Sequence, residues 1–391
     1  MIAWKSRIRL FVGAWFVLLL AVVAQASPSA AVSPAETPFF EDDMALQNLA
    51  AALTRSLAYL HNVPASNRYA IAGQMVPVQR LIDSAHHLQQ LVQSHPSPEE
   101  INRRLNRDYE IIQINKPQEA APKRMLITGY YQPIFPGSLK QQPPYLFPLY
   151  RIPDDLLIRQ EGSKKKVLGR KDKGIIAPYW SRQEIEQGQL LHGQELVWLK
   201  DPFDAFILHV QGSGIIRLVD GSVRGVHYAV NNGREYRSIG KYLVDTGRMQ
   251  LADVTMDSIR HYIDQHPAER DLILHQNDSF IFFHWSPPGP AIGNLGQELT
   301  PGRSIAADQR SYPPGSLVFL DCRRPIMIEG QLAEWKRMRR LVTVQDTGAA
   351  LTGPGRIDVF WGTGEQAGQE AGQMKEDGMA YLLLLKEEIR E

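Results

Sequence analysis

Two aspartates in apolar, strand-like segments are the residues best suited to chemistry. Asp346 lies in the segment 344–348, and Asp358 lies in the segment 357–362. A carboxylate in such surroundings costs several kcal/mol to desolvate unless it has partners. Each aspartate is therefore either hydrogen-bonded for structural reasons, which is the commoner case, or held for catalysis with a shifted pKa.

Two hydrolase patterns come close in this sequence and fail. Asp346-Thr347-Gly348 is the tripeptide of aspartic proteases. That chemistry needs two carboxylates that share one proton, and the long β-rich chain around Asp346 argues against it. A serine-hydrolase elbow needs Gly two residues before its nucleophile, but Gln211 stands at that position before Ser213. The segment 211–214 is predicted to be a polar loop at a groove.

Histidine and cysteine usage predicts no metal site and no cofactor. Cys322 is the only cysteine, so no disulfide can form within the chain, and its thiol is predicted to be buried and structural. The net charge of +1 gives no reason to expect a nucleic-acid partner. The histidines lack the spacing of a zinc site; they include His209, His227, His261, His275 and His284.

Several aromatic residues lie near Gly or Pro turns. Such residues pack in cores about as often as they are exposed, and an exposed aromatic face can stack on a sugar ring. Some of them could therefore line a saccharide cleft. The candidates are Tyr130, Tyr131, Trp180, Tyr228, Trp285 and Trp361.

The elements that must position these residues change character after Pro122. Residues 39–114 have helical apolar spacing, and Ser97-Pro98 followed by two glutamates indicates a helix start. Beyond Pro122, short apolar runs between Gly and Pro turns predict β-barrels rather than a doubly wound sheet. A helix is predicted over 257–265, and the basic segment 164–171 is predicted to be a solvated loop. The strand-like runs are 125–128, 196–199, 206–210, 279–283, 316–320, 341–344 and 357–361.

The N-terminus has the pattern of an export signal. Basic residues precede an apolar stretch over 10–24, and Ala24-Gln25-Ala26 supplies the small residues of a cleavage site. We expect a signal peptide over 1–26, a flexible tether over 27–38, and an exported, periplasmic protein. An uncleaved membrane anchor is the alternative, although the stretch is short for a spanning helix. No cysteine lies close behind this stretch, so we expect no lipid anchor at this end.

Six segments match a family pattern in order. They are Thr128-Gly-Tyr-Tyr-Gln-Pro133, His209-Val-Gln-Gly-Ser-Gly214, Tyr236-Arg-Ser-Ile-Gly240, Asn277-Asp-Ser-Phe-Ile-Phe-Phe283, Leu299-Thr-Pro-Gly-Arg-Ser304, and Gln345-Asp-Thr-Gly348 with Asp358. Together they resemble the membrane-bound lytic murein transglycosylase A family with its C-terminal 3D domain, over roughly 125–385. The resemblance implies a mainly β fold with N-terminal helices. A double-psi β-barrel would carry the catalytic Asp, and a second, smaller β-barrel domain would be inserted into it.

The implied domain boundaries place the helical region and the first part of the catalytic domain at 39–134. The inserted domain would cover 135–271, and the 3D domain at 272–391 would complete the catalytic domain. A deep groove between the two barrels would hold a peptidoglycan glycan strand. Asp346 and Asp358 match two of the three aspartates that give the 3D domain its name, and Asp308 and Asp377 are candidates for the third.

The resemblance also implies a reaction, which is non-hydrolytic cleavage of the β-1,4 bond between N-acetylmuramic acid and N-acetylglucosamine. Asp358 would act first as acid and then as base, because the C6 hydroxyl of the muramoyl residue replaces water as nucleophile. Alternatives are a glycan hydrolase with Asp346 as second carboxylate, or a non-catalytic, expansin-like binding protein. The residues expected to bind the glycan are Thr128, Gly129, Tyr130, Gln211, Ser213, Tyr228, Asp308 and Asp346.

One position departs from the family pattern, where Ala349 stands in place of the second Gly of Asp-Thr-Gly-Gly-Ala. A Cβ at this position matters only if the backbone needs a positive φ.

Overall fold

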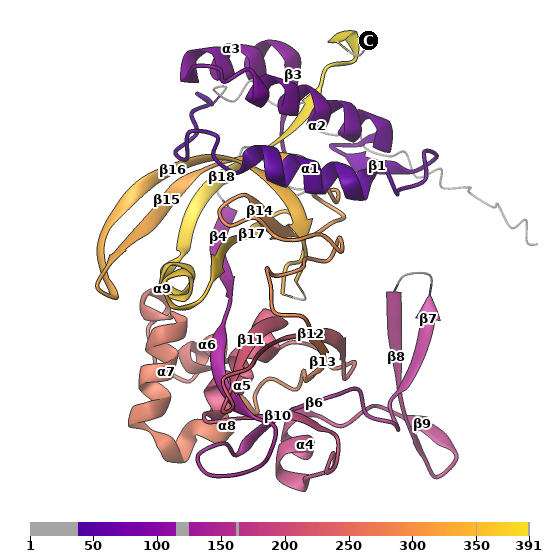
Figure 1. Ribbon diagram of the computed structural model, residues 1–391, viewed down its shortest axis with the longest axis vertical. Coiled ribbons are helices and arrows are strands. Elements are labelled where there is room, and N and C mark those ends of the chain that lie inside the picture. Colours follow the sequence, from indigo (N-terminus) through magenta and orange to yellow (C-terminus); the bar gives the residue numbers. More distant parts are fainter. Residues whose placement is uncertain (1–37, 115–124, 162–163, 349, 390–391) are drawn as a thin grey trace, which may run out of the picture.

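A computed structural model describes residues 38–114, 125–161, 164–348 and 350–389. The chain forms two β-rich parts, one above the other in Figure 1, with three helices over the upper part. The predicted signal peptide, nearly all of the tether, and Ala349 lie outside the described residues. Among the residues that are described, no helix has the length and apolar character needed to cross a membrane.

The upper part is a closed six-stranded barrel, which confirms the predicted mainly β fold with N-terminal helices. The strand order is β15-β16-β14-β17-β4-β18, and β18 returns to pair with β15. Two of the pairings, β14 with β16 and β17 with β4, are parallel. The strands are β4 (Met125–Gln132), β14 (Ser304–Ala307), β15 (Leu317–Ile328), β16 (Gln331–Asp346), β17 (Arg356–Thr363) and β18 (Lys375–Leu385). Helix α9 (Glu365–Gln373) connects β17 to β18, and β3 (Tyr109–Gln113) adds to the outer edge of β18.

The two-residue period of β17 orients the side chains near the predicted acid. Ile357 and Val359 are fully buried in the barrel core, whereas Asp358 between them is only half-buried. Successive side chains of a strand point to opposite faces, so burying the two aliphatic residues turns Asp358 away from the core.

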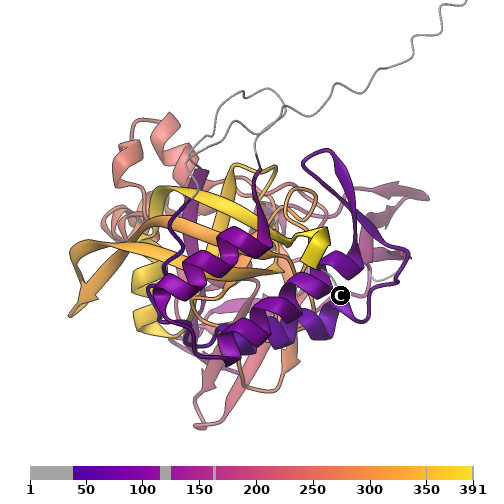
Figure 2. The same ribbon diagram turned by 90° about the horizontal axis from the view of Figure 1, so that it is seen from above.

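Three helices cover one end of the barrel, as the view from above shows (Figure 2). They are α1 (Leu49–Leu60), α2 (Val78–Gln93) and α3 (Pro98–Asp108), and a hairpin of β1 (Arg68–Ile71) and β2 (Gln74–Pro77) separates the first two. The predicted start of α3 is confirmed, because the Ser97 hydroxyl accepts the Glu100 amide at 3.2 Å and Pro98 follows the cap. The hairpin was not anticipated in the helical region.

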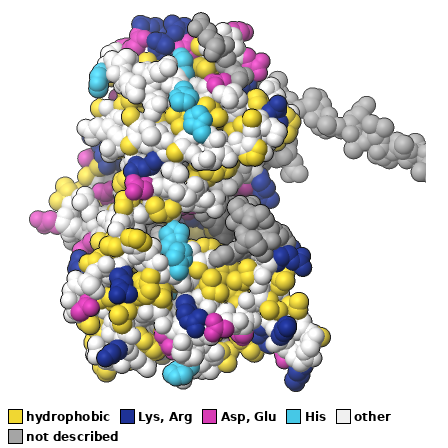
Figure 3. All heavy atoms as spheres, turned by 45° about the vertical axis from the view of Figure 1, so that its right-hand side comes forward, with side chains coloured by type: hydrophobic (Ala, Val, Ile, Leu, Met, Phe, Trp, Pro, Cys, Tyr) yellow, Lys and Arg dark blue, Asp and Glu magenta, His cyan; other side chains and the backbone are white. Residues whose placement is uncertain are grey.

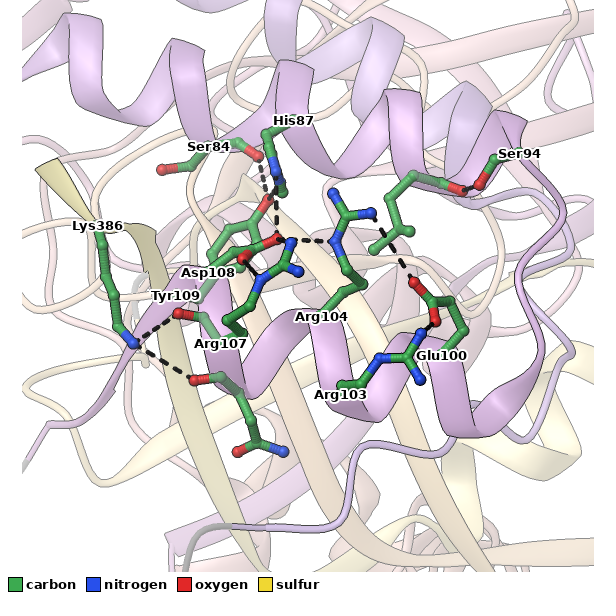
Figure 4. Close-up of polar contacts among 12 residues, drawn as sticks. Ser84, His87, Ser94, Glu100, Arg103, Arg104, Arg107, Asp108, Tyr109 and Lys386 are labelled. Atoms are coloured by element: carbon green, nitrogen blue, oxygen red, sulfur yellow. Dashed lines mark hydrogen bonds and ion pairs between the residues drawn. The ribbon is translucent and has the colours of Figure 1, made fainter. Parts of the chain in front are cut away.

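Polar contacts gather where the end of α3 meets the end of β18 (Figure 4). The Asp108 side chain is fully buried and accepts bonds from Arg107 Nε at 2.5 Å and Arg104 Nε at 2.9 Å. Burial would raise the pKa of Asp108, but the two guanidinium groups outweigh it and hold the pKa below its usual value. The Asp108 carbonyl accepts the Lys386 amide at 2.9 Å, so the same residue ties the helix end to β18.

The lower part is built from the chain between β4 and β14. Its six-stranded sheet has the order β13-β12-β11-β5-β10-β6. Three further strands form an arm that projects from it (Figure 1). The sheet strands are β5 (Ile134–Ser138), β6 (Phe147–Tyr150), β10 (Glu195–Leu199), β11 (Ser213–Leu218), β12 (Val223–Asn231) and β13 (Ile281–Ser286); the arm is β7 (Leu157–Glu161), β8 (Lys164–Asp172) and β9 (Ile175–Ala177); the helices are α4 (Arg182–Gly188), α5 (Pro202–Gln211), α6 (Ile239–Asp245), α7 (Met256–Gln265) and α8 (Arg270–Leu274).

The domain boundaries drawn from the sequence stay a prediction. β13 lies beyond residue 271, yet it pairs with β12 in the lower sheet. The chain therefore crosses back to the barrel only between β13 and β14.

Three local predictions were wrong. The segment 211–214 is not a loop, because Gln211 ends α5 and Ser213 begins β11, with Gly212 alone between them at a positive φ. The run 206–210 is helical and lies in α5, because Asp201 caps the helix by accepting the Phe203 amide at 2.7 Å and Pro202 opens the first turn. A five-residue apolar run does not distinguish a buried strand from a buried helix, and here the flanking caps decide. The basic segment 164–171 is not a loop but most of β8. The helix predicted over 257–265 is confirmed as α7.

The face shown in Figure 3 carries charged side chains of both signs in both halves, and hydrophobic side chains gather in patches in its lower half. Exposed apolar residues of the lower part include Leu139, Leu146, Ile175, Ile176, Val219 and Val223.

A buried ion pair attaches the N-terminal segment to the barrel. Arg303 is 0% exposed and donates to the two carboxylate oxygens of Asp42 at 2.6 and 2.7 Å. The same guanidinium donates to the carbonyl of Leu341 at 2.8 Å. Burial would raise the pKa of Asp42, but the bonds from Arg303 outweigh burial and hold it below its usual value.

Asp42→Ala should destabilise the fold by about 3–5 kcal/mol, because it leaves a buried guanidinium without its counter-charge. Since the folded-state pKa of Asp42 is lowered, its stabilisation is present above the unfolded-state pKa of about 3.9 and is lost as pH falls through the folded-state value. Urea unfolding at pH 7 measures the first effect, and a series of unfolding curves at pH values below the unfolded-state pKa of about 3.9 measures the second. The exposed Asp154, paired with Arg151, is the control, and Asp154→Ala should change stability little. Equal losses in both variants would contradict the role given to the buried pair.

Candidate active site

Asp358 lies on β17 where the barrel faces the lower part. Its side chain is 18% exposed. In the ladder it is level with Thr128 of β4 on one side and with Ala306 of β14 on the other. The Thr128 hydroxyl donates a short hydrogen bond to Asp358 Oδ1. The neighbouring strand therefore fixes the orientation of the carboxyl group.

Arg356 is the second partner of Asp358 and was not predicted from the sequence. Its Nε lies 3.1 Å from Asp358 Oδ1 and its Nη2 lies 3.4 Å from Oδ2. Both nitrogens also reach the Thr128 hydroxyl, at 3.3 and 3.2 Å. The signal was present, since residues two apart on a strand share a face.

Burial and the guanidinium act on Asp358 in opposite directions. Burial raises the pKa of the carboxyl and is the larger effect; the charge of Arg356 and the hydrogen bonds from Thr128 and Arg356 lower it, and the result lies above the usual value. A carboxyl with a raised pKa can remain protonated at a pH where ordinary aspartates are ionised. That is the property of a general acid.

Asp346, at the end of β16, is held by fixed donors. Oδ1 accepts the backbone amides of Asn294 and Thr347, each at 2.9 Å. Oδ2 accepts the Tyr130 hydroxyl at 3.1 Å. Burial is the largest influence and raises the pKa of Asp346, while the two amides, Tyr130 and the charge of His227 lower it.

The two aspartates flank a single residue of the strand between them. Ala306 is level with Asp346 on β16 and with Asp358 on β17. Adjacent strands lie about 4.8 Å apart, which places the two backbones about 10 Å from each other. The Tyr130 ring lies where both charges act on it, and burial and both carboxylates raise the pKa of its hydroxyl.

Side chains of the lower part that act on this face of the barrel include Gln211, His227 and Tyr236. Gln211 Oε1, at the end of α5, accepts the Tyr131 amide at 3.2 Å. His227 of β12 places Nε2 3.1 Å from the Ile292 carbonyl and its charge acts on Asp346. Tyr236 is half-buried, and burial raises the pKa of its hydroxyl. The charge of Arg356 lowers this pKa and the charge of Asp358 raises it, so both groups lie close to Tyr236.

Comparisons with known proteins identify relatives of this chain. One family model, described as the MltA specific insert domain, matches residues 126–284, and a second, the 3D domain, matches residues 303–384. The lytic transglycosylase LtgG of Burkholderia pseudomallei is 32% identical; the match covers 92% of this chain and 99% of that one, with a TM-score of 0.52. The chain belongs to the membrane-bound lytic murein transglycosylase A family.

Other relatives extend this result. Membrane-bound lytic murein transglycosylase A of Escherichia coli K12 is 32% identical over 258 residues, which is 66% of this chain and 64% of the relative's length. A crystal structure of the Escherichia coli protein with bound chitohexaose is 25% identical, with a TM-score of 0.68 over 91% of this chain and 94% of that one. The transglycosylase of Agrobacterium tumefaciens is 27% identical, with a TM-score of 0.70 over 88% and 93%.

Within this member of the family, four of the predicted residues meet. Thr128, Tyr130, Asp346 and Asp358 form one hydrogen-bonded and electrostatic cluster on the barrel. Gln211 reaches the same strand through the Tyr131 amide.

Ser213 and Tyr228 lie on two paired strands of the lower sheet, β11 and β12. Ser213 begins β11, opposite His227 of β12. Tyr228 follows His227 and is 41% exposed.

Gly129 and Asp308 lie in different settings. A Cβ on Gly129 would come within 2.5 Å of Trp361 Nε1 and 2.8 Å of Ala371 Cα, so this position permits close packing of β4 against α9. Asp308 accepts Arg310 Nη2 and the Gly353 amide, at 2.8 and 2.6 Å, and these bonds help to lower its pKa to about 2. Both residues act on the backbone around the site rather than in the Asp358 cluster.

Other chemistries find no matching geometry in the described ranges. No group of three or more His, Cys, Asp or Glu there is arranged to hold a metal ion. Cys322 is buried, and burial raises the pKa of its thiol to about 12. A second Asp-Thr-Gly begins at Asp245, but this carboxylate is exposed on α6 and pairs with Lys241, so it does not share a proton with Asp346.

Asp358→Asn should stabilise the folded protein at neutral pH. The folded-state pKa of Asp358 is raised, so its stabilising contribution is present below the unfolded-state pKa and is lost as pH rises through the folded-state value. Asn has the shape of the protonated aspartic acid but cannot ionise, so the variant keeps this stability at neutral pH. Denaturant midpoints at several pH values measure the effect, and the gain over wild type should shrink as the solution is acidified. A variant less stable than wild type at pH 7 would contradict the balance of burial and charge described for Asp358.

Proposed function

We propose that this chain is an exported lytic transglycosylase that cuts peptidoglycan glycan strands. The bond cleaved is the β-1,4 linkage from N-acetylmuramic acid to N-acetylglucosamine, and the product ends in 1,6-anhydro-muramic acid. The observation that carries the proposal is the half-buried carboxyl of Asp358, whose pKa is raised and which the Thr128 hydroxyl and Arg356 hold in place. Membership of the transglycosylase family and the saccharide bound by the Escherichia coli relative support it.

In the proposed mechanism Asp358 exchanges one proton twice. The protonated carboxyl first gives its proton to the glycosidic oxygen as the bond from C1 breaks. The resulting carboxylate then takes the proton of the muramoyl C6 hydroxyl as O6 bonds to C1. Because the nucleophile belongs to the same sugar, the attack is intramolecular and needs no second carboxylate to activate water.

The neighbours of Asp358 have positioning roles in this scheme. Thr128 holds one carboxylate oxygen by its short hydrogen bond. Tyr130 and Asp346 form a fixed polar pair beside the acid, since three donors satisfy Asp346. Gln211, Ser213 and Tyr228 would meet the glycan from the lower part, while Gly129 and Asp308 shape the backbone that supports it.

A hydrolase on the same fold is the second candidate, with Asp346 activating a water. The bonds of Asp346 argue against it, because two of its three donors are backbone amides, which cannot turn away and which favour the ionised carboxylate over the protonated form that a base must reach. The partners of Asp358 are side chains instead.

Asp358→Asn should lower the rate of sacculus digestion by about 10²–10⁴-fold, the usual contribution of general acid–base catalysis. Release of soluble muropeptides measures the rate. The matched control is Asp245→Asn, on an exposed carboxylate paired with Lys241, and it should digest at the wild-type rate.

Mass spectrometry of the wild-type products then separates the candidates. Anhydro ends, lighter by one water than reducing ends, are expected; reducing ends would refute the transglycosylase mechanism, and an Asp358→Asn enzyme with full activity would refute the acid.

Tyr228→Ala should raise KM about 2- to 10-fold and leave kcat nearly unchanged. Stacking of an aromatic ring contributes about 0.5–1.5 kcal/mol, and a contact made equally in ground and transition states affects binding alone. Initial rates over a range of sacculus concentrations measure both constants. Leu272→Ala removes a comparably exposed side chain from α8 and is the control. A loss confined to kcat would place Tyr228 in the chemical step instead.

A further inference from the structure

Arg356 is the charged group in direct contact with Asp358. It occupies the first position of β17, two residues before the aspartate and on the same face of the strand. Its guanidinium contacts both carboxylate oxygens and the Thr128 hydroxyl, with four nitrogen–oxygen distances between 3.1 and 3.4 Å. The side chain is 35% exposed, so a desolvated carboxyl meets a cation that is still partly hydrated.

We propose that Arg356 is a positioning residue of the transglycosylase reaction. It holds Asp358 in one orientation through both proton transfers, and it stabilises the carboxylate that exists between them. This inference rests on the proposed function and adds to it the group that supports the acid in its ionised form.

The need for such a group follows from the proton balance. When the O–H bond of Asp358 breaks and the proton moves to the glycosidic oxygen, a negative charge appears on a carboxyl group that burial disfavours. When the C6 hydroxyl gives up its proton and O6 bonds to C1, that charge disappears again. A cation in two-pronged contact lowers the energy of the intermediate state at no cost of reorganisation, because it is already in place.

The other groups around Asp358 do not supply this charge. Thr128 and Tyr130 on β4 and Tyr236 in the lower part carry neutral hydroxyls, and Asp346 on β16 is an acid. His227 on β12 acts on Asp346. Among the described residues, Arg356 is the cation in contact with the Asp358 carboxylate.

The charge of Arg356 also affects the highest pH at which the enzyme is active, because it lowers the pKa of Asp358. The resting enzyme must hold a protonated Asp358, so kcat/KM should fall as pH rises through the pKa of this carboxyl. Arg356 opposes protonation. Its removal should therefore raise the pKa of Asp358 further, and the alkaline fall in kcat/KM should move to higher pH.

Three variants of the full chain test these consequences on purified sacculi. In Arg356→Gln, the alkaline fall should move to higher pH and kcat at its plateau should drop by about 10²–10³-fold, as when a preorganised donor is removed. Arg356→Lys keeps the charge but loses the planar, two-pronged contact. It should keep the wild-type pH limit and lose less kcat. Arg337→Gln, on an exposed arginine paired with Asp321, should match wild type in both respects.

A merely structural role for Arg356 would lower the rate without moving the pH limit, so an unchanged limit in Arg356→Gln overturns the inference. The inference is also overturned if the pH limit of Arg356→Lys moves as far as that of Arg356→Gln. Arg356→Gln is compared with wild type only if its denaturant midpoint shows that it is folded. If it is not folded, Arg356→Lys decides, because the inference expects this variant to have a lower kcat and the wild-type pH limit.

A carboxyl titration that needs no turnover separates this inference from the proposed function. Infrared or carbon-13 spectra of wild type, with Asp358→Asn to assign the signal, follow the protonation of Asp358. In Arg356→Gln the signal should titrate at higher pH than in wild type. An inactive wild type would refute the proposed function alone, whereas an unmoved titration would refute the action of Arg356 on Asp358.

Discussion

A bulge beside β14 is the constraint on which the site depends. Along the ladder with β16, Ile305 is level with Val344 but Ala306 is level with Asp346, so Gln345 is an extra residue in that strand. Without it, Asp346 would be one position out of step and would point to the other face. The bulge therefore sets Asp346 level with Asp358, across Ala306. All four residues of β14 are buried, which leaves this short strand little freedom to shift.

The bulged residue is itself held in place from two directions. The Ser304 hydroxyl donates to Gln345 Oε1 at 2.5 Å, and Gln345 Nε2 donates to the Ala52 carbonyl of α1 at 2.9 Å. A fully buried amide in this position would be costly without both bonds. The N-terminal helices thus do more than cover the barrel, since one of them stabilises the register that aligns the two aspartates.

The sequence predicted the parts of the fold whose signals are local. The apolar segments that contain Leu320, Val342 and Val359 predicted barrel strands, and Ser97-Pro98 predicted the start of a helix. The Gln345 bulge and the Arg356 contact could not be derived in this way, because each depends on which strands become neighbours. The error at 206–210 has the same origin in part, since a short apolar run suits either a buried strand or a buried helix. Asp358 stood out from Asp346 only through the family resemblance; in the structure, their different partners distinguish them.

The insertion of the lower part between β4 and β14 has a consequence for folding. The lower sheet draws all of its strands from one continuous stretch, so it can assemble from its own sequence. The barrel cannot, because the bond from Thr128 to Asp358 joins residues 230 positions apart. Contacts of such long range form slowly and require the later strands to be present. The lower sheet can therefore be complete while the barrel is still open, and Asp358 meets Thr128 only when the C-terminal strands close the barrel.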